Sequence, residues 1–302
     1  MNPPIIFFGN ERLATGLGKI TPVILPALIN KSYNVVAVVV NDRPQSSRTA
    51  RVLEVEEIAL AHNIPIWRDK PIDLLSRLNA AEPALGVLVA YGRIIPQSII
   101  ESFKLGIVNL HPSLLPKLRG TTPIETAILE GSSESGVSIM SLEQAMDAGP
   151  LYAQKTIALS GDESKQELSE RFLQVGGELL LKNLSGILCG ELTPSAQTGE
   201  PTYTNPLTKD QSLINWDKPA TQIEKEIRAY LNWPTSRSTI ATKDVIITSV
   251  TVVQQSGNPG HFFKQGKSLG VYCKKGALFI NTLKPAGKND MGAAEFLAGN
   301  PL

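Results

Sequence analysis

The sequence predicts an α/β fold, a doubly wound and mostly parallel Rossmann-like sheet, followed by a small β barrel. Three observations support this. Short apolar runs alternate with longer segments of mixed polarity in the first half of the chain. These runs are apolar throughout, which is typical of strands covered by helices on both faces. Near the end of the chain, β-type runs are separated by glycine turns, as in small barrels or sandwiches.

The first domain is predicted to span residues 1–189. Its expected strands are the short apolar runs, at residues 5–8, 35–40, 85–90, 106–110, 136–142 and 151–159. Its expected helices are the longer mixed segments, at residues 20–30, 50–62 and 163–188. Because parallel strands need crossover connections, this alternation places helices on both faces of the sheet.

A stretch dense in Pro, Gly, Ser and Thr, residues 190–208, is predicted to be a linker. The second domain, residues 209–302, is predicted to be the small barrel. One helix is expected at residues 220–230, and strands are expected at 244–253, 268–273 and 277–283.

The composition indicates a globular chain. Its 302 residues, 42% of them hydrophobic, can bury a sizeable core and exceed the usual length of one domain. The apolar stretch at residues 5–8 is too short for a signal peptide, and no stretch reaches the roughly 20 apolar residues that span a bilayer. Cys189 and Cys273 lie far apart, without metal-ligand neighbours. We therefore expect a cytoplasmic protein with no membrane partner.

Charge is divided unevenly along the chain. The net charge is +1, but the part from Asn205 onward carries 12 Lys and Arg against 7 Asp and Glu, and the part before it carries 17 against 21. A basic tail suits an anionic partner such as RNA, although it also fits an ordinary solvated surface.

A glycine-rich loop follows the first expected strand. Its glycines, Gly9, Gly16 and Gly18, lack the spacing of the dinucleotide-binding motif. Asp42, after the second strand, has the position of a ribose-binding acid, but it also suits a turn beside Arg43. We favour the turn and expect no NAD site.

Three polar residues are the candidate catalytic groups. Asn109 and His111 are two apart at the end of an expected strand, so both side chains should project from the same face. Asp147 follows the next expected strand and precedes a turn. Ligands of open α/β sheets bind beyond the carboxyl ends of the strands, where these three residues can meet.

This trio suits the transfer of a formyl group to an amine. The acceptor's own amine attacks, so the protein needs no Ser or Cys nucleophile. An Asn amide can stabilise the oxyanion, an imidazole can handle protons near neutral pH, and a carboxylate can orient the imidazole. Taken singly, such a His or Asp is usually structural. No second His or Cys completes a ligand set around His111 and Asp147, so we expect no metal.

The stretch Asn109-Leu110-His111-Pro112-Ser113-Leu114-Leu115-Pro116, followed by Arg119-Gly120 and Asp147-Ala148-Gly149, resembles the signature of the folate-dependent formyltransferases. The resemblance implies catalytic roles for Asn109, His111 and Asp147, with 10-formyltetrahydrofolate as co-substrate. It also implies that Ser113, Leu114, Leu115 and Pro116 lie along the folate site, and that the loop containing Tyr91 and Gly92 surrounds the pterin.

The second half resembles the members of this family that formylate methionyl initiator tRNA. The similarity lies in Asn232-Trp233-Pro234, in residues 214–216 and in residues 283–291. It implies an oligonucleotide-binding-type (OB-like) barrel that helps to hold tRNA, with Lys284 and Lys288 as candidate phosphate contacts, although both also suit an ordinary solvated surface.

The sequence departs from the family at two places. Family members usually carry Thr-Pro where this chain has Asn10-Glu11, and the loop after Pro44 is shorter and less basic here, though Arg43 remains as a candidate tRNA contact. Two alternatives stay open. One is a formyltransferase that acts on a nucleotide-linked sugar amine, and the other is a non-catalytic RNA-binding protein with an inherited fold.

Overall fold

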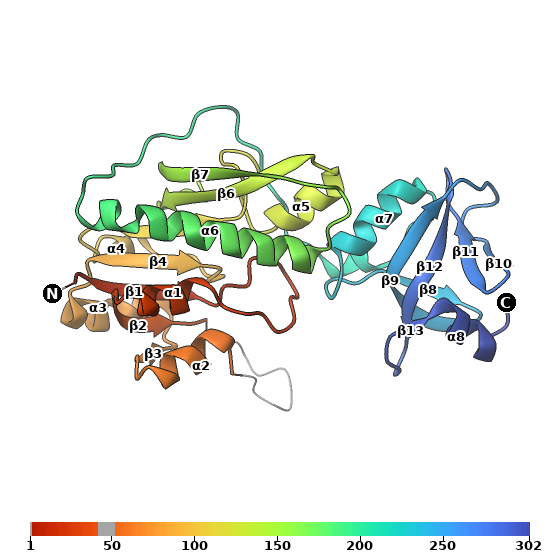
Figure 1. The fold of residues 1–302 in the computed structure, drawn as a ribbon, viewed down its shortest axis with the longest axis horizontal. Coiled ribbons are helices and arrows are strands. Elements are labelled where there is room, and N and C mark those ends of the chain that lie inside the picture. The colour runs from red at the N-terminus through yellow and green to blue at the C-terminus, as the bar shows by residue number, and fades with distance from the viewer. Residues whose placement is uncertain (1, 42–51) are drawn as a thin grey trace. The chain divides into compact units, whose positions relative to one another are not determined.

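A computed structural model describes residues 2–41 and 52–302 (Figure 1). The chain divides into two compact units, which we call the front unit and the tail unit. The front unit comprises Met1–Pro123, Glu134–Ala158 and Leu168–Thr204, and the tail unit comprises Ile124–Ser133, Leu159–Glu167 and Asn205–Leu302. Each unit has its own sheet and its own core.

The described residues of the front unit form a seven-stranded sheet in the order β3-β2-β1-β4-β5-β6-β7. Its strands are β1 (Pro4–Gly9), β2 (Asn34–Val39), β3 (Ile66–Trp67), β4 (Leu85–Val89), β5 (Ile107–His111), β6 (Glu134–Ser141) and β7 (Leu151–Ala158). Strands β1 to β5 pair in parallel, and β6 and β7 pair antiparallel. The predicted mostly parallel sheet is confirmed.

The central strands are buried: β1 and β4 are apolar on both faces, and β5 also buries the polar Asn109 and His111. Residues 5–8 of β1 and all residues of β4 and β5 are buried. Short helices connect these strands: α1 (Ile24–Asn30), α2 (Glu54–Ala61), η1 (Pro71–Leu74), α3 (Leu75–Ala81) and α4 (Gln97–Ile100). The sequence analysis missed the last three because each spans about one or two turns, too few for a helical period to appear.

Helix α6 (Lys165–Leu188) confirms the long helix expected at 163–188. It packs closely behind β5, because Gly176 lies against Leu110. A Cβ added at Gly176 would lie 2.5 Å from Leu110 Cδ1. Leu110 separates Asn109 from His111 and points to the opposite face of the sheet from them, as alternation along a strand requires. The helix therefore supports the strand that carries both residues.

The described residues of the tail unit form a curled antiparallel sheet in the order β10-β11-β12-β9-β8, with β13 paired to β12. Its elements are α7 (Ala220–Ala229), β8 (Arg237–Ile240), β9 (Lys243–Val253), β10 (Phe262–Gln265), β11 (Ser268–Tyr272), β12 (Ala277–Pro285), β13 (Met291–Gly292) and α8 (Ala293–Gly299). The predicted small β unit is confirmed. Strands β8, β10 and β13 were not expected, because each is short, at most four residues.

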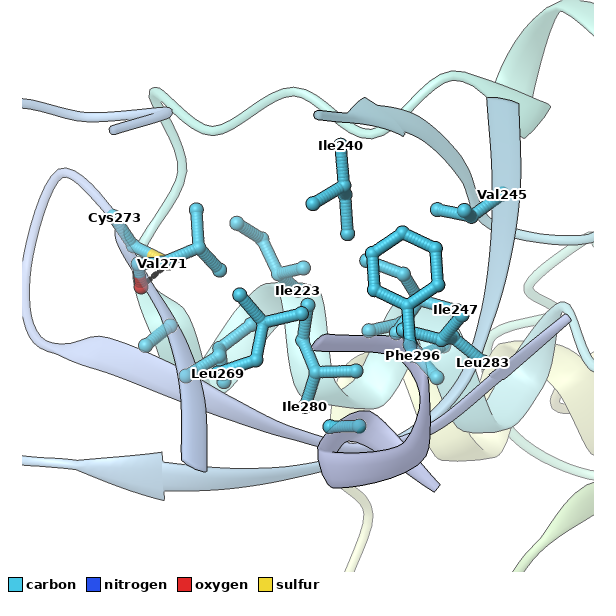
Figure 2. Packing of buried hydrophobic residues seen from close by; sticks show 14 of the residues in the cluster. Ile223, Ile240, Val245, Ile247, Leu269, Val271, Cys273, Ile280, Leu283 and Phe296 are labelled. Atoms are coloured by element: carbon cyan, nitrogen blue, oxygen red, sulfur yellow. Dashed lines mark hydrogen bonds between the residues drawn. The ribbon is translucent and has the colours of Figure 1, made fainter. Parts of the chain in front are cut away.

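The tail core forms between this sheet and its two helices. Figure 2 shows Ile223 of α7 and Phe296 of α8 among Ile247, Leu269 and Leu283 of the strands. All of these side chains are at most 2% exposed. Fully burying a side chain of this size contributes roughly 1.5–3 kcal/mol, so each of these residues stabilises this small unit.

A buried lysine joins the separate segments of the tail unit. Lys165 is fully buried and donates a hydrogen bond from Nζ to the Trp233 carbonyl oxygen at 3.1 Å. Burial lowers its pKa from 10.5 to about 8, while the nearby Glu125 carboxylate of α5 (Pro123–Glu130) opposes this shift. Arg228 of α7 donates to the Glu163 carbonyl oxygen at 2.8 Å. These contacts explain why segments 124–133 and 159–167 belong to the tail unit.

Candidate active site

A cavity of about 480 Å³ lies at the carboxyl ends of strands β1, β4 and β5 of the front unit. This is the edge at which open α/β sheets bind their ligands. The lining comes from the last residues of β4 and β5 and from segments that follow strands of the sheet, at residues 10, 12–17, 41, 88, 90–92, 109–112, 120, 121 and 123. A volume of this size falls within the usual range for small-molecule sites.

Asn109 and His111 lie in β5 and line this cavity together. Asn109 is opposite Met140 of β6, and His111 is opposite Ser138. Asn109 is 7% exposed and His111 is 5% exposed, so both residues are largely removed from water. Hydrogen bonds are electrostatically stronger in such a site than in bulk solvent.

Both ring nitrogens of His111 face acceptors. Nε2 lies 3.1 Å from the Leu118 carbonyl oxygen, which can only accept, so Nε2 carries a proton in this arrangement. Nδ1 lies 3.7 Å from Asp147 Oδ2, an ion-pair distance rather than a hydrogen bond. The ring is therefore held between a backbone carbonyl and a carboxylate, which fixes its orientation.

Asp147 does not line the cavity. It is connected to two residues that do, Gly120 and His111. Its Oδ2 accepts the backbone N–H of Gly120 at 2.7 Å and faces His111. Its backbone is left-handed, with φ of 48°, an uncommon conformation for a residue other than glycine. The carboxylate is thus held behind the imidazole by a strained turn.

Tyr91 and Gly92 line the cavity, as the position of their loop after β4 suggests. Tyr91 is 2% exposed and packs edge-on against Phe8, with ring centroids 5.6 Å apart. Burial raises the pKa of its phenol, so the hydroxyl stays protonated at neutral pH. Gly92 has a φ of 73°, which glycine adopts without strain.

Ser113, Leu114, Leu115 and Pro116 are not among the cavity-lining residues. The first is fully buried, and its Oγ donates to the Lys117 carbonyl oxygen at 2.6 Å. Ser138 Oγ of β6 donates to the Ser113 carbonyl oxygen at 2.6 Å and accepts the Leu115 N–H at 3.2 Å. This segment therefore anchors the loop that follows β5 onto β6.

The remaining predicted contacts lie outside the front unit's described site. Arg43 and Asp42 fall outside the described residues. Lys284 and Lys288 belong to the tail unit and are exposed. A second cavity, about 450 Å³ in volume, lies within the tail unit beside β8, β9 and β12, and Lys284 lines it.

Sequence reasoning missed two parts of the site. The loop at residues 12–17 forms one wall of the cavity, and Arg12 pairs there with Glu54 at 2.5 Å. The segment 195–204, which has the composition of a linker, contacts Asp147 itself and Arg119, the residue before Gly120. No local pattern identifies either contact, because each joins residues far apart in sequence.

Across residues 2–41 and 52–302, no three His, Cys, Asp or Glu side chains are grouped as metal ligands would be. None of the described helices is long and apolar enough to cross a bilayer.

The chain belongs to the formyl transferase family. It matches the formyl transferase domain over residues 13–184 and the formyl transferase carboxy-terminal domain over residues 206–301. It is therefore a transferase of one-carbon groups.

Within that family the chain is similar to methionyl-tRNA formyltransferases. That of Trichlorobacter lovleyi is 35% identical over 305 residues, covering 99% of this chain and 94% of the relative. That of Myxococcus xanthus is 36% identical over 306 residues, covering 99% of this chain and 96% of the relative.

Solved structures share the fold at lower identity. HypX from Aquifex aeolicus, in complex with tetrahydrofolic acid, superposes with a TM-score of 0.68 at 16% identity. The match covers 98% of this chain and 46% of HypX, so the chain spans about half the length of that protein. An N-formyltransferase from Helicobacter canadensis, in complex with folinic acid and dTDP-3-aminofucose, has a TM-score of 0.67 at 18% identity, with 93% and 99% of the two chains covered.

Proposed function

We propose that this chain transfers the formyl group of 10-formyltetrahydrofolate to the amino group of methionyl initiator tRNA. The observation that carries the proposal is the meeting of Asn109 and His111 in one cavity, with Asp147 Oδ2 3.7 Å from His111 Nδ1. The names of the relatives that match nearly the whole chain support the choice of acceptor.

The cavity suits a folate donor. It lies at the edge of the sheet where ligands bind, and Tyr91 and Gly92 form part of its wall. HypX and the Helicobacter canadensis enzyme, which share the fold, were solved with tetrahydrofolic acid and folinic acid respectively. We expect the donor's formyl end to lie beside Asn109 and His111.

The reaction needs groups on the protein that stabilise the developing negative charge and handle the proton. The acceptor's amine attacks the formyl carbon, and negative charge develops on the formyl oxygen. The intermediate then collapses as the bond between that carbon and N10 of the donor breaks, so that N10 takes up a proton and tetrahydrofolate leaves. The Asn109 amide donates a hydrogen bond to that oxygen, and the largely buried setting strengthens the interaction. His111, which lines the same cavity, is the second group proposed to act there: its imidazole can stabilise the oxyanion or take up the amine's proton, and the Asp147 carboxylate orients its ring.

The proposed tRNA-holding part is residues 209–302, the portion of the tail unit that follows the proposed linker. This part of the chain has a net positive charge, with 12 Lys and Arg against 7 Asp and Glu from Asn205 onward. Lys284 and Lys288 are exposed and belong to or follow β12. Neutralising phosphates with such residues releases counterions and makes binding salt-dependent.

The test is formyl transfer from labelled 10-formyltetrahydrofolate to three acceptors: methionyl initiator tRNA, methionyl elongator tRNA and a nucleotide-linked amino sugar. We expect label on initiator tRNA, and loss of that activity in His111→Ala and Asp147→Ala. Faster transfer to the amino sugar would replace the tRNA assignment with a sugar-amine activity. Equal turnover by wild type and both variants would remove the proposed mechanism.

A further inference from the structure

The side chain of Gln197 uses both ends of its amide at the turn that carries Asp147. Its Nε2 donates to the carbonyl oxygens of Asp147 and Gly149, each at 2.8 Å. Its Oε1 accepts from Arg119, at 3.2 Å from Nε and 2.7 Å from Nη2. One neutral side chain therefore joins the turn at 147–149 to the loop that follows β5.

The Asp147 turn depends on such support. Asp147 has a left-handed backbone with φ of 48°. This conformation costs free energy, so it persists only where surrounding contacts hold it in place. On its far side the turn is fixed by close packing, because a Cβ added at Gly149 would lie 1.8 Å from the Ser141 carbonyl oxygen. At Asp147 itself, the turn is held by the Gln197 amide, which donates to the Asp147 carbonyl oxygen.

The same segment also fixes the other partner of the Asp147 carboxylate. Thr204 donates its backbone N–H to the Arg119 carbonyl oxygen at 2.8 Å. Its Oγ1 would lie 2.6 Å from a Cβ added at Gly120, so the two residues pack closely. Gly120 supplies the N–H that Asp147 Oδ2 accepts. Segment 195–204 thus contacts Asp147 in two ways: Gln197 binds the backbone carbonyl of Asp147, and Thr204 packs against Gly120, the partner of the Asp147 carboxylate.

We propose that Gln197 is a positioning residue, which sets the orientation of the Asp147 carboxylate toward His111. This inference rests on the proposed function, because it assigns Gln197 a role through Asp147. The positioning role belongs to the Nε2 donor of the amide, because the two carbonyl oxygens that it binds belong to the Asp147 turn. The acceptor half serves Arg119, whose guanidinium also reaches Tyr203.

Two substitutions separate these halves. Gln197→Ala removes both the Nε2 donor and the Oε1 acceptor. Gln197→Glu keeps an acceptor for Arg119 but places an oxygen, which cannot donate, against the carbonyls of Asp147 and Gly149. We expect both variants to lower kcat for formyl transfer 10- to 100-fold, the usual cost of losing an outer support of a functional group, with KM changed less than threefold. Thr198→Ala, an exposed neighbour, is the control and should keep wild-type kcat. A Gln197→Glu variant with wild-type kcat would overturn the donor role.

A double-mutant cycle with Asp147→Asn distinguishes positioning from general damage to the fold. If Gln197 acts through Asp147, then adding Gln197→Ala to Asp147→Asn should slow single-turnover transfer by less than twofold more. A further 10-fold loss would show an independent structural effect and overturn the inference. Wild-type activity in Asp147→Asn alone would instead remove Asp147 from the mechanism. No transfer to methionyl initiator tRNA by the wild-type chain would refute the proposed function, so the failures are distinguishable.

Discussion

The carboxylate of Asp147 accepts the backbone N–H of Gly120 at 2.7 Å, although 27 positions separate the two residues in sequence. Gly120 has a φ of 115°, a conformation open to glycine, and Thr204 leaves no room for a Cβ. This contact orients the carboxylate that faces His111, and it can be broken without altering any proposed catalytic side chain.

Gly120→Ala should lower formyl transfer at least 10-fold, because the added Cβ must displace Thr204 or shift the Gly120 N–H away from Asp147. Gly161→Ala is the matched control. That glycine also has a positive φ, of 92°, but nothing lies within 4 Å of its would-be Cβ. The measurement is the rate of tRNA formylation together with thermal unfolding. Equal rates in both variants would show that this hydrogen bond does not matter.

Asn109→Ala should lower kcat about 100- to 1,000-fold, the usual cost of losing one oxyanion donor. Donor KM should change much less, since the interaction strengthens only as charge develops. Asn34→Ala is a suitable control, because Asn34 is exposed at the amino end of β2 and its side-chain amide donates to the Asn2 carbonyl oxygen. A fall confined to KM would point instead to a role in binding the donor.

Lys284→Ala and Lys288→Ala should each weaken tRNA binding. The slope of log K against log salt should fall in magnitude by about 1 for each lost phosphate contact. Lys31→Ala removes the same charge from the turn after α1, near the amino ends of the front strands, and should leave the slope unchanged. An unchanged slope in both tail variants would identify Lys284 and Lys288 as ordinary surface lysines.

Lys165 should make stability depend on pH in the alkaline range. Its pKa is about 8 in the folded protein and 10.5 ordinarily, because burial disfavours the charged form. Between these values the unfolded chain binds more protons, so stability rises as pH increases from 8 to 10.5. The free energy of unfolding of wild type relative to Lys165→Gln should therefore rise by on the order of 3 kcal/mol across that window. Parallel urea titrations of the two proteins would contradict this.

Phe296→Ala should destabilise the tail unit by about 3–5 kcal/mol, the usual cost of emptying a buried aromatic site. Phe296 is 1% exposed and lies in the core shown in Figure 2. Leu302→Ala, at a position 52% exposed, should change stability by less than about 0.5 kcal/mol. Urea unfolding monitored by circular dichroism would measure both. A small effect of Phe296→Ala would mean that the core closes over the gap.

Much of the fold follows from local pattern. The apolar runs of β1, β4 and β5 and the long amphipathic pattern of α6 all depend on neighbours within a few positions, so the sequence identifies them. Strand alternation similarly indicates that Asn109 and His111 share a face. Elements with one or two turns, such as α3 and α5, and the half-polar β8 give too weak a period to be recognised.

The sequence alone determined the α/β class, the β-rich tail, and the chemistry available from an amide, an imidazole and a carboxylate. Only the tertiary structure decided that Gln197, 50 positions from Asp147, holds the turn of that carboxylate, and that Lys165 is buried beside Glu125. The physical reason is that periodicity reports on the neighbours of a residue along the chain. Contacts between distant segments depend instead on how the sheets and helices pack, which no local pattern encodes.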